Sequence, residues 1–286
     1  MKLTELFKKK TVLSYEVFPP KPTVPVQTIY DTIYELKELS CDFISVTYGA
    51  GGGKNNNESF KIASAIRGCG MESVAHLPCI GLTKDEVSAK LKELEKIGVE
   101  NILALRGDMP SEGCKPGDFR YASELIAYIK SQGDFHIIAA CYPEGHIEAR
   151  SKMEDIRNLK HKVDAGAEHL ITQLFFDNEY FYAFAERCQF ADIDVPIEAG
   201  IMPVTNKKQI ERMASLCGAT VPKKFVAMME RYENNPIAMR DAGIAYAVDQ
   251  IVDLIAHGVD GIHLYTMNQP YIARKIHESI HRLIER

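Results

Sequence analysis

The sequence predicts a (β/α)8 barrel, the TIM-barrel fold, forming one catalytic domain over residues 1–286. Two observations favour this fold class. Eight short β-rich segments alternate with helical patterns along the whole chain, and most of them are continuously apolar or β-branched, as parallel strands covered by helices should be. The eight segments are 12–18, 42–48, 72–80, 101–107, 135–142, 169–176, 195–201 and 261–267. A chain of 286 residues also has a typical length for one such barrel.

Helical patterns fill the intervals between these segments. In 83–98, Thr83 and Glu86 have the spacing of a capping box, apolar residues then recur on one face, and Gly98 follows where the helix should end. Residues 218–258 contain more helix than one crossover requires, so we expect extra helical segments between strands seven and eight. The second fold considered is a doubly wound open sheet. That fold favours a Gly-x-Gly-x-x-Gly loop after the first strand, where this sequence reads EVFPPKP.

Composition and charge narrow the class of function. The chain is 46% hydrophobic and 26% charged, and its net charge of −5 argues against a general nucleic-acid surface. No apolar run reaches membrane-spanning length, and the first residues lack the features of a secretory signal. Seven scattered cysteines without a Cys-x-x-Cys pair indicate reduced thiols rather than disulfides or a structural zinc. These features predict a cytoplasmic protein that binds neither membranes nor nucleic acid.

The stretch SVTYGAGGGKNNNE, residues 45–58, raises the question of a nucleotide-binding loop. A Walker loop would need glycine at Tyr48 and serine or threonine at Asn55. The dinucleotide fingerprint fits Gly49 and Gly51 but meets Lys54 where its third glycine belongs. Taken alone, the stretch fits a flexible connection between a strand and a helix better than a nucleotide-binding loop.

Polar side chains stand at the ends of the predicted strands, which all meet at one mouth of a barrel. Glu16 and Gln173 are the sharpest cases, because each interrupts an otherwise apolar strand. The alternative is that such residues lie in the barrel interior and are satisfied by their neighbours. Metal chemistry is not expected: His146 and Glu148 form a His-x-Glu, but the partner motif of the zinc deaminases is missing.

Several stretches, taken together and in order, carry a family resemblance: YEVFPP, VTYGAGG, AHLPC, LALRGDMP, YPEGH, NLKHKVDAGAEHLITQLFFD and HLYTMN. With them the chain resembles methylenetetrahydrofolate reductases, flavin-dependent barrel enzymes of one-carbon metabolism that serve methionine biosynthesis. The resemblance runs from residue 14 to residue 268. It implies that FAD binds at the barrel mouth without a Rossmann loop. The implied flavin-contacting positions are Thr47, His76, Arg106, Gly107, Asp108, Tyr121, Ala122, Ala140, Tyr142, His146, Asp155 and Lys162.

The resemblance also implies a reaction and its catalytic residues. Hydride passes from NADH or NADPH to FAD, and then to 5,10-methylenetetrahydrofolate, giving 5-methyltetrahydrofolate. Glu16 matches the general acid that opens the substrate ring, Asp108 matches the carboxylate beside flavin and pterin, and Gln173 matches an amide that contacts the substrate. The glycine loop would then lie beside a nucleotide cofactor whose main contacts come from several strand ends.

Two departures from the family pattern keep a second hypothesis open. Gln269 stands where many members have an arginine suited to the folate tail, and Met213 stands where some have a phenylalanine that packs the nicotinamide cofactor. The alternative is a flavin- and folate-binding subunit that receives electrons through a partner chain, and a homo-oligomer is equally compatible with the sequence. A barrel hydrolase or aldolase without flavin is a third class, but the strand ends show neither a histidine cluster nor a lysine for a Schiff base.

Overall fold

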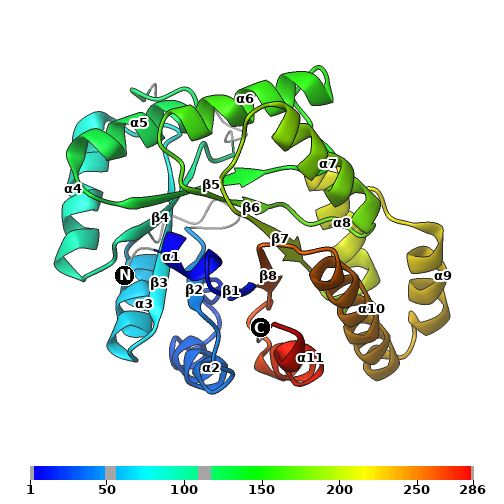
Figure 1. Ribbon diagram of the computed structural model, residues 1–286. Helices are drawn as coiled ribbons and strands as arrows, with labels where there is room; N and C mark the ends of the chain where they lie inside the picture. Colours follow the sequence, from blue (N-terminus) through cyan, green and yellow to red (C-terminus); the bar gives the residue numbers. More distant parts are fainter. Residues whose placement is uncertain (1–2, 49–55, 109–116, 285–286) are drawn as a thin grey trace.

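The structure, a computed structural model, describes residues 3–48, 56–108 and 117–284, and its eight parallel strands close into a barrel in sequence order (Figure 1). The predicted (β/α)8 fold is therefore confirmed. The strands are β1 (Val12–Val17), β2 (Phe43–Val46), β3 (Glu72–Pro78), β4 (Asn101–Leu105), β5 (His136–Cys141), β6 (His169–Thr172), β7 (Ile197–Ile201) and β8 (Gly261–Tyr265). Closure comes from the pairing of β1 with β8, which places Ser14 beside His263 and Glu16 beside Tyr265.

Helices surround the barrel and follow the strands in turn. They are α2 (Gln27–Lys37), α3 (Asn56–Gly68), α4 (Lys84–Lys96), α5 (Ala122–Gln132), α6 (Lys152–Asp164), α7 (Asn178–Phe190), α8 (Lys207–Cys217), α9 (Lys223–Tyr232), α10 (Pro236–Ala256) and α11 (Pro270–Ile284). Helices α8, α9 and α10 all lie between β7 and β8, which confirms the extra helical segments expected there. Helix α9 lies at the outer edge of the molecule (Figure 1).

Local sequence signals explain where individual elements begin and end. Helix α4 begins with the capping box expected at Thr83 and Glu86, and Gly98 after it adopts a φ of +73°, a backbone conformation that suits glycine. Strand β6 is shorter than the segment 169–176 that the apolar run predicted. It pairs with β7 only through Leu170 and Ile171, and the chain then leaves the barrel towards α7.

Alternating side chains divide the core into two shells. Leu13, Tyr15 and Val17 on β1 pack outward against helices, whereas Val12 belongs to a separate cluster inside the barrel. The inner cluster comprises Leu3, Val12, Phe43, Val74, Leu103, Ile138 and Ile171. With this alternation, Ser14 and Glu16 share the inward face of β1, so the same strand that builds the apolar core also delivers polar groups to the interior.

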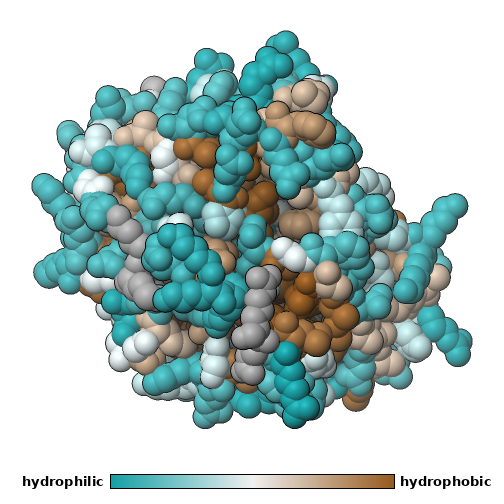
Figure 2. All heavy atoms as spheres, viewed as in Figure 1, coloured by the Kyte–Doolittle hydropathy of each residue, from teal (hydrophilic) through white to brown (hydrophobic). Residues whose placement is uncertain are grey.

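The short helix α1 (Thr4–Phe7) lies across the end of the barrel at which the strands begin. In Figure 1 it stands in front of the strands, at the centre of the ring of helices. Leu3 is buried there, and the ring of Phe7 lies 4.9 Å from that of His169. We call this end the closed end and the opposite end the mouth. Figure 2 shows that polar side chains cover most of the closed-end face, with apolar ones gathered nearer its centre.

Candidate active site

Glu16 is the central carboxylate of the mouth. Its Oε2 lies 3.6 Å from Nε2 of His76 on β3 and 3.7 Å from Nε2 of His263 on β8. Neither imidazole nitrogen has a hydrogen-bond partner among the described residues, although both are buried. The Glu16 side chain remains 18% exposed. Two buried, unsatisfied nitrogens thus point at one partly exposed carboxyl group, an arrangement suited to holding or moving a proton.

The flanking imidazoles differ in how they are held. Burial lowers the pKa of His76 to about 4, with a further lowering from His263 that the nearby Glu16 opposes, so His76 is neutral at neutral pH. His263 is fixed from behind, because its Nδ1 lies 2.6 Å from the Ser14 hydroxyl. That contact leaves only Nε2 of His263 to face Glu16.

Arg106 and Asp108 follow β4 at the rim of the mouth. The Arg106 guanidinium donates to both carboxylate oxygens of Glu148, at 2.5 and 2.8 Å. Gly107 between them has a φ of +87°, and a Cβ there would come within 2.9 Å of Ile80, so the turn that exposes Asp108 requires glycine.

A cavity of about 570 Å³ opens beside Arg106. Tyr121 and Glu124 line it, and Tyr121 is the N-cap residue of α5, with the buried Ala122 as the first residue of that helix. Arg120 lies over the Tyr121 ring at 5.3 Å. The cavity wall thus combines two arginines, an aromatic ring and a helix N-terminus with the carboxylates of Asp118, Glu124 and Glu148. The cationic groups and the ring suit an anionic ligand with a planar group, which would compete there with these carboxylates.

A second group of predicted residues gathers around β5 and α6. Lys162 reaches from α6 to donate to the carbonyl of Ala140 at 2.9 Å. The Tyr142 and His146 rings meet edge to face at 4.6 Å, and His146 Nδ1 accepts from the backbone N–H of Glu148, which puts the proton of neutral His146 on Nε2. Burial raises the pKa of Asp155 and lowers those of Lys162 and His146.

Gln173 follows β6 on the opposite side of the mouth. Its Oε1 accepts from the Cys217 thiol of α8 at 3.6 Å. Met213 of the same helix packs against the cluster that contains Leu174 and Phe176. The structure therefore gives Met213 a place at the edge of a core cluster, and it puts α8 directly beside the Gln173 amide.

Gln269, the second residue that departs from the family pattern, lies in the loop after β8. The Gln269 backbone N–H donates to Thr266 O, and the preceding Met267 and Asn268 both have positive φ values. Asn268 in turn bonds the N–H and the carbonyl of Phe18, at 3.1 and 2.8 Å. These two hydrogen bonds connect the loop after β8 to the segment that follows Glu16.

The glycine loop in question lies mostly outside the described residues, since the structure does not describe 49–55. Thr47 and Tyr48 precede it at the end of β2. The hydroxyls of both are buried and have no hydrogen-bond partner within the described ranges. Thr47 thus joins His76 and His263 as a mouth residue with an unsatisfied polar atom.

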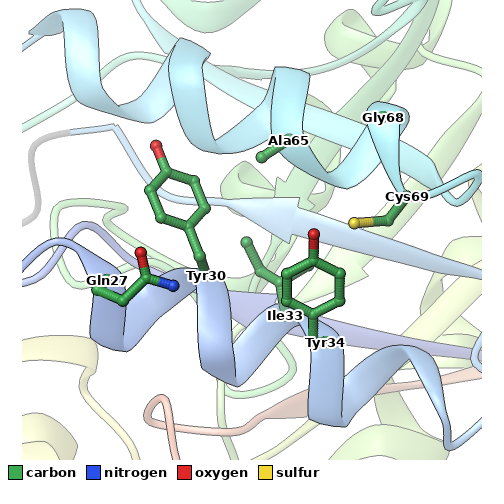
Figure 3. A pocket seen from close by; sticks show the side chains of 7 residues that line it. All are labelled: Gln27, Tyr30, Ile33, Tyr34, Ala65, Gly68 and Cys69. Carbon is green, nitrogen blue, oxygen red and sulfur yellow. The ribbon is translucent and has the colours of Figure 1, made fainter.

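Another cavity, of about 420 Å³, lies on the outside of the barrel between α2 and α3. Figure 3 shows the rings of Tyr30 and Tyr34 standing on α2 and reaching toward α3, where Ala65 and Cys69 form the facing wall. None of the residues predicted for the site lines it.

Sequence reasoning missed three parts of this arrangement. His263 lies in a stretch used for the resemblance but was not assigned a role, although it shares the inward face of β8 with Tyr265. Glu148 was considered only for a metal motif, and its pairing with Arg106, 42 residues away, carries no local signal. Glu198 on β7 was not considered, and its charged side chain in the apolar stretch VPIEAGI was the signal that could have found it.

The fold and these mouth residues define a (β/α)8-barrel enzyme whose polar groups converge where the strands end. The chain belongs to the methylenetetrahydrofolate reductase family, a family of oxidoreductases whose sequence model matches residues 2–281. A relative named 5,10-methylenetetrahydrofolate reductase from Pectobacterium carotovorum subsp. carotovorum is 38% identical over 92% of this chain and 88% of its own length. The relative of the same name from Escherichia coli (strain K12) is also 38% identical, over 90% and 86%. The resemblance expected from the sequence is thereby confirmed.

Two further comparisons add detail. A relative from Arabidopsis thaliana, named Methylenetetrahydrofolate reductase (NADH) 1, is 36% identical over 91% of this chain but only 46% of its own length. Among solved structures, an uncharacterized protein from Clostridium thermocellum, described as binding two copies of 5-methyl-5,6,7,8-tetrahydrofolic acid, aligns with a TM-score of 0.63. It covers 97% of both chains at 14% identity, which shows a shared fold. Within the described residues, no helix has the length and apolar character needed to cross a membrane.

Proposed function

We propose that this chain reduces 5,10-methylenetetrahydrofolate to 5-methyltetrahydrofolate, with FAD bound at the mouth and NADH or NADPH as the hydride donor. Family membership supports the overall reaction. The observation that carries the mechanism is the position of Glu16, a carboxyl group at the barrel mouth between two buried imidazoles. NADH is the first donor to test, because one relative is named for it.

Glu16 serves as the general acid in this proposal. The five-membered ring of the substrate opens only when its leaving nitrogen gains a proton, and the opened form is a cationic iminium that can accept hydride. The partly exposed Glu16 carboxyl can reach a substrate lying over the mouth, and neutral His76 leaves it without a fixed cationic partner on that side. Glu16 thus delivers the proton, and its conjugate base stays close to the cation that forms.

Asp108 and Gln173 position the substrate. Asp108 is exposed on the turn created by Gly107, where its carboxylate can accept hydrogen bonds from the pterin ring and favour the iminium electrostatically. Gln173 contributes an amide, a group with both donors and acceptors, held near α8 by Cys217. These two side chains approach the mouth from β4 and β6, so they can bracket a flat ligand.

The described residues fit a flavin dinucleotide. Arg106, the N-terminus of α5 and the ring of Tyr121 border a cavity large enough for part of such a cofactor. His146 and Lys162 offer donors for a pyrophosphate or ribityl chain, and the unsatisfied Thr47 hydroxyl offers another at the end of β2. When bound, FAD would supply the hydride chemistry that amino-acid side chains lack.

The test is an anaerobic visible spectrum of the purified chain, recorded before and after addition of NADH and then of methylenetetrahydrofolate. We expect a flavin spectrum that bleaches with NADH and returns with the folate. A spectrum that NADH leaves unchanged, while dithionite-reduced flavin is still reoxidised by the folate, would move electron delivery to a partner chain. A colourless protein that FAD does not reconstitute would overturn the proposed function.

A further inference from the structure

A chain of buried polar side chains runs through the barrel interior behind Glu16. Glu198 on β7 accepts from the Ser14 hydroxyl at 2.8 Å, and Ser14 also lies 2.6 Å from His263 Nδ1. On its other side, Glu198 Oε2 lies 3.0 Å from His169 Nε2. Ser14, Glu198, His263 and His169 are completely buried. The reaction described above uses none of these groups except His263, which faces Glu16.

The Glu198 side chain is held in place by close packing and by polar neighbours. It packs over Gly261 of β8, where a Cβ would come within 2.7 Å of Glu198 Cγ. The groups that face it are the Ser14 hydroxyl, His263 and His169, with Asp42 and Asp260 as the more distant charges. Burial raises the pKa of Glu198 to about 7, with the nearby His263 and Ser14 opposing the rise, so the carboxyl group can hold a proton near neutral pH.

The interior chain does not match a metal site. No group of three or more histidine, cysteine, aspartate or glutamate side chains in the described part of the chain has an arrangement that could hold a metal ion. The distances between neighbours from His169 to His263 are instead those of hydrogen bonds. Such a chain can pass protons.

We propose that Glu198 is a buried proton store that reloads Glu16 through Ser14 and His263. Glu198 never touches the substrate and acts through His263, so it is a positioning residue for the proton rather than a catalytic one. The proposal rests on the acid role of Glu16 in the proposed function. It goes further by naming the internal source of the proton that each turnover consumes.

The proton transfer balances along the chain. In the loaded state, Glu198 O–H donates to Ser14 Oγ, Ser14 O–H donates to His263 Nδ1, and His263 Nε2–H points at the Glu16 carboxylate. Each donor then passes its proton one step forward. Glu16 becomes a carboxylic acid, Ser14 donates to the Glu198 carboxylate, and His263 is neutral with its proton on Nδ1. One proton has moved from Glu198 to Glu16, no group carries a new charge except these two carboxyls, and no oxidant or reductant is needed.

An internal source matters because the mouth is the face that ligands cover. Only 18% of the Glu16 side chain is exposed, and a flat ligand over the mouth would remove that access to water. Glu198 has a refilling route on its other side, since His169 Nδ1 lies 3.1 Å from His136 Nε2. His136 Nδ1 lies 3.4 Å from Glu168, which pairs with Lys130 at the partly exposed closed end.

The experiment measures the two half-reactions of the FAD-loaded chain separately, by stopped flow, across about pH 6 to about pH 9. Glu198→Gln keeps the size and hydrogen-bonding capacity of the side chain but cannot store a proton. We expect the folate half-reaction of Glu198→Gln to slow by about tenfold near pH 7, where wild-type Glu198 still holds a proton. The difference from wild type should shrink toward about pH 9, where the wild-type carboxyl is ionised as well. Flavin reduction by NADH should keep the wild-type rate.

Matched variants separate proton storage from packing. Ser14→Ala breaks the route between Glu198 and His263 and should reproduce the altered pH profile. Ser45→Ala removes an equally buried serine from the neighbouring strand, where the hydroxyl has no hydrogen-bond partner in the described residues, and should keep the wild-type profile. Glu198→Asp should restore part of the rate. A wild-type pH profile in both Glu198→Gln and Ser14→Ala would overturn the proposal, as would equal effects of Ser14→Ala and Ser45→Ala.

A second readout does not depend on activity. The infrared difference spectrum of the FAD-free chain, between acidic and alkaline pH, should contain a buried carboxylic-acid band that disappears in Glu198→Gln. Loss of this band together with an inactive wild type would contradict the proposed function, and it would leave Glu198 as a protonated buried carboxyl group without the role of reloading Glu16. An active wild type whose carboxylic-acid band is unchanged in Glu198→Gln would contradict the proton store alone.

Discussion

Two groups of buried polar side chains, one at the mouth and one in the interior toward the closed end, differ in how their polar atoms are bonded. At the mouth, Thr47 Oγ1, His76 Nε2 and His263 Nε2 have no hydrogen-bond partner among the described residues. Toward the closed end, His136, His169 and Glu198 bond one another in sequence. An unsatisfied buried polar atom costs about 1–3 kcal/mol. The difference between these two groups teaches that the bonded interior side chains stabilise the fold, whereas the unsatisfied side chains at the mouth are available to a ligand.

The largest expected effect comes from removing the acid at the mouth. Glu16→Gln should slow the folate half-reaction by about 10²- to 10⁴-fold, because the amide cannot protonate the leaving nitrogen. Flavin reduction by NADH should change by less than about twofold, since no proton from Glu16 is required there. Stopped-flow absorbance measures both half-reactions, and Glu38→Gln, on the exposed end of α2, is the control. Equal loss of both half-reactions would falsify the acid role.

The next effect concerns how stability depends on pH. Because the pKa of Glu198 is raised to about 7 from 4.5, the folded chain binds more protons than the unfolded one between these values, and this group lowers stability as pH rises. His76, His136 and His169 have lowered pKa values, so they raise stability as pH increases toward 6.5. The free energy of unfolding of Glu198→Gln should therefore rise more than that of wild type between acidic pH and pH 7. We expect this extra rise to be on the order of 2–3 kcal/mol.

Urea unfolding of the FAD-free chain at several pH values measures this difference. Glu38→Gln, on the exposed end of α2, is the control, since its carboxyl lies at the surface and outside the buried interior. A free energy difference between Glu198→Gln and wild type that stays constant from acidic to neutral pH would show that Glu198 ionises normally in the fold.

A smaller effect is expected at the rim of the mouth. Arg106→Ala should weaken FAD binding by about tenfold or more, because a charge-assisted bond contributes about 1.5–3 kcal/mol. Arg120→Ala, on the same cavity wall but stacked on Tyr121, should have a weaker effect. Fluorescence titration with FAD gives both dissociation constants. Undiminished binding in Arg106→Ala would place the pyrophosphate elsewhere.

The smallest effects test the comparison most directly. Thr47→Val removes an unsatisfied hydroxyl at the mouth and should stabilise the chain by about 1 kcal/mol while weakening FAD binding severalfold. Ser14→Ala removes a satisfied hydroxyl of the interior chain and should destabilise it by about 1–2 kcal/mol. Thermal unfolding reports both. Changes of the same sign would remove the distinction between the two ends.

The sequence made the fold and the mouth predictable because both follow from local rules. Eight alternating strand and helix units predict the barrel. Because all strands of such a barrel end on the same side, residues near strand ends such as Glu16 and Gln173 lie at one mouth. The period of two also puts Ser14 and Glu16 on one inward face. The structure shows Glu16 and Gln173 at the mouth, whereas the roles of these two residues in the reaction stay predictions.

The interior chain could not be predicted in the same way. The inward positions of Glu198, His169 and His263 are readable from alternation, but which of them meet depends on the stagger between strands. The pairing of Arg106 with Glu148 depends likewise on two loops from different strands. Contacts set by barrel closure and by loop conformation have no signature in the spacing of residues.

The Arg106–Glu148 pair has a consequence for ligand affinity. Glu148 is an anion tethered beside the guanidinium, so any phosphate that uses Arg106 must first displace it, as it would a competing ligand of fixed local concentration. The Glu148 side chain is 55% exposed, and such a pair contributes about 0–1 kcal/mol. The protein therefore carries its own mild competitive inhibitor, which lowers apparent affinity by at most about fivefold and keeps the arginine oriented between binding events.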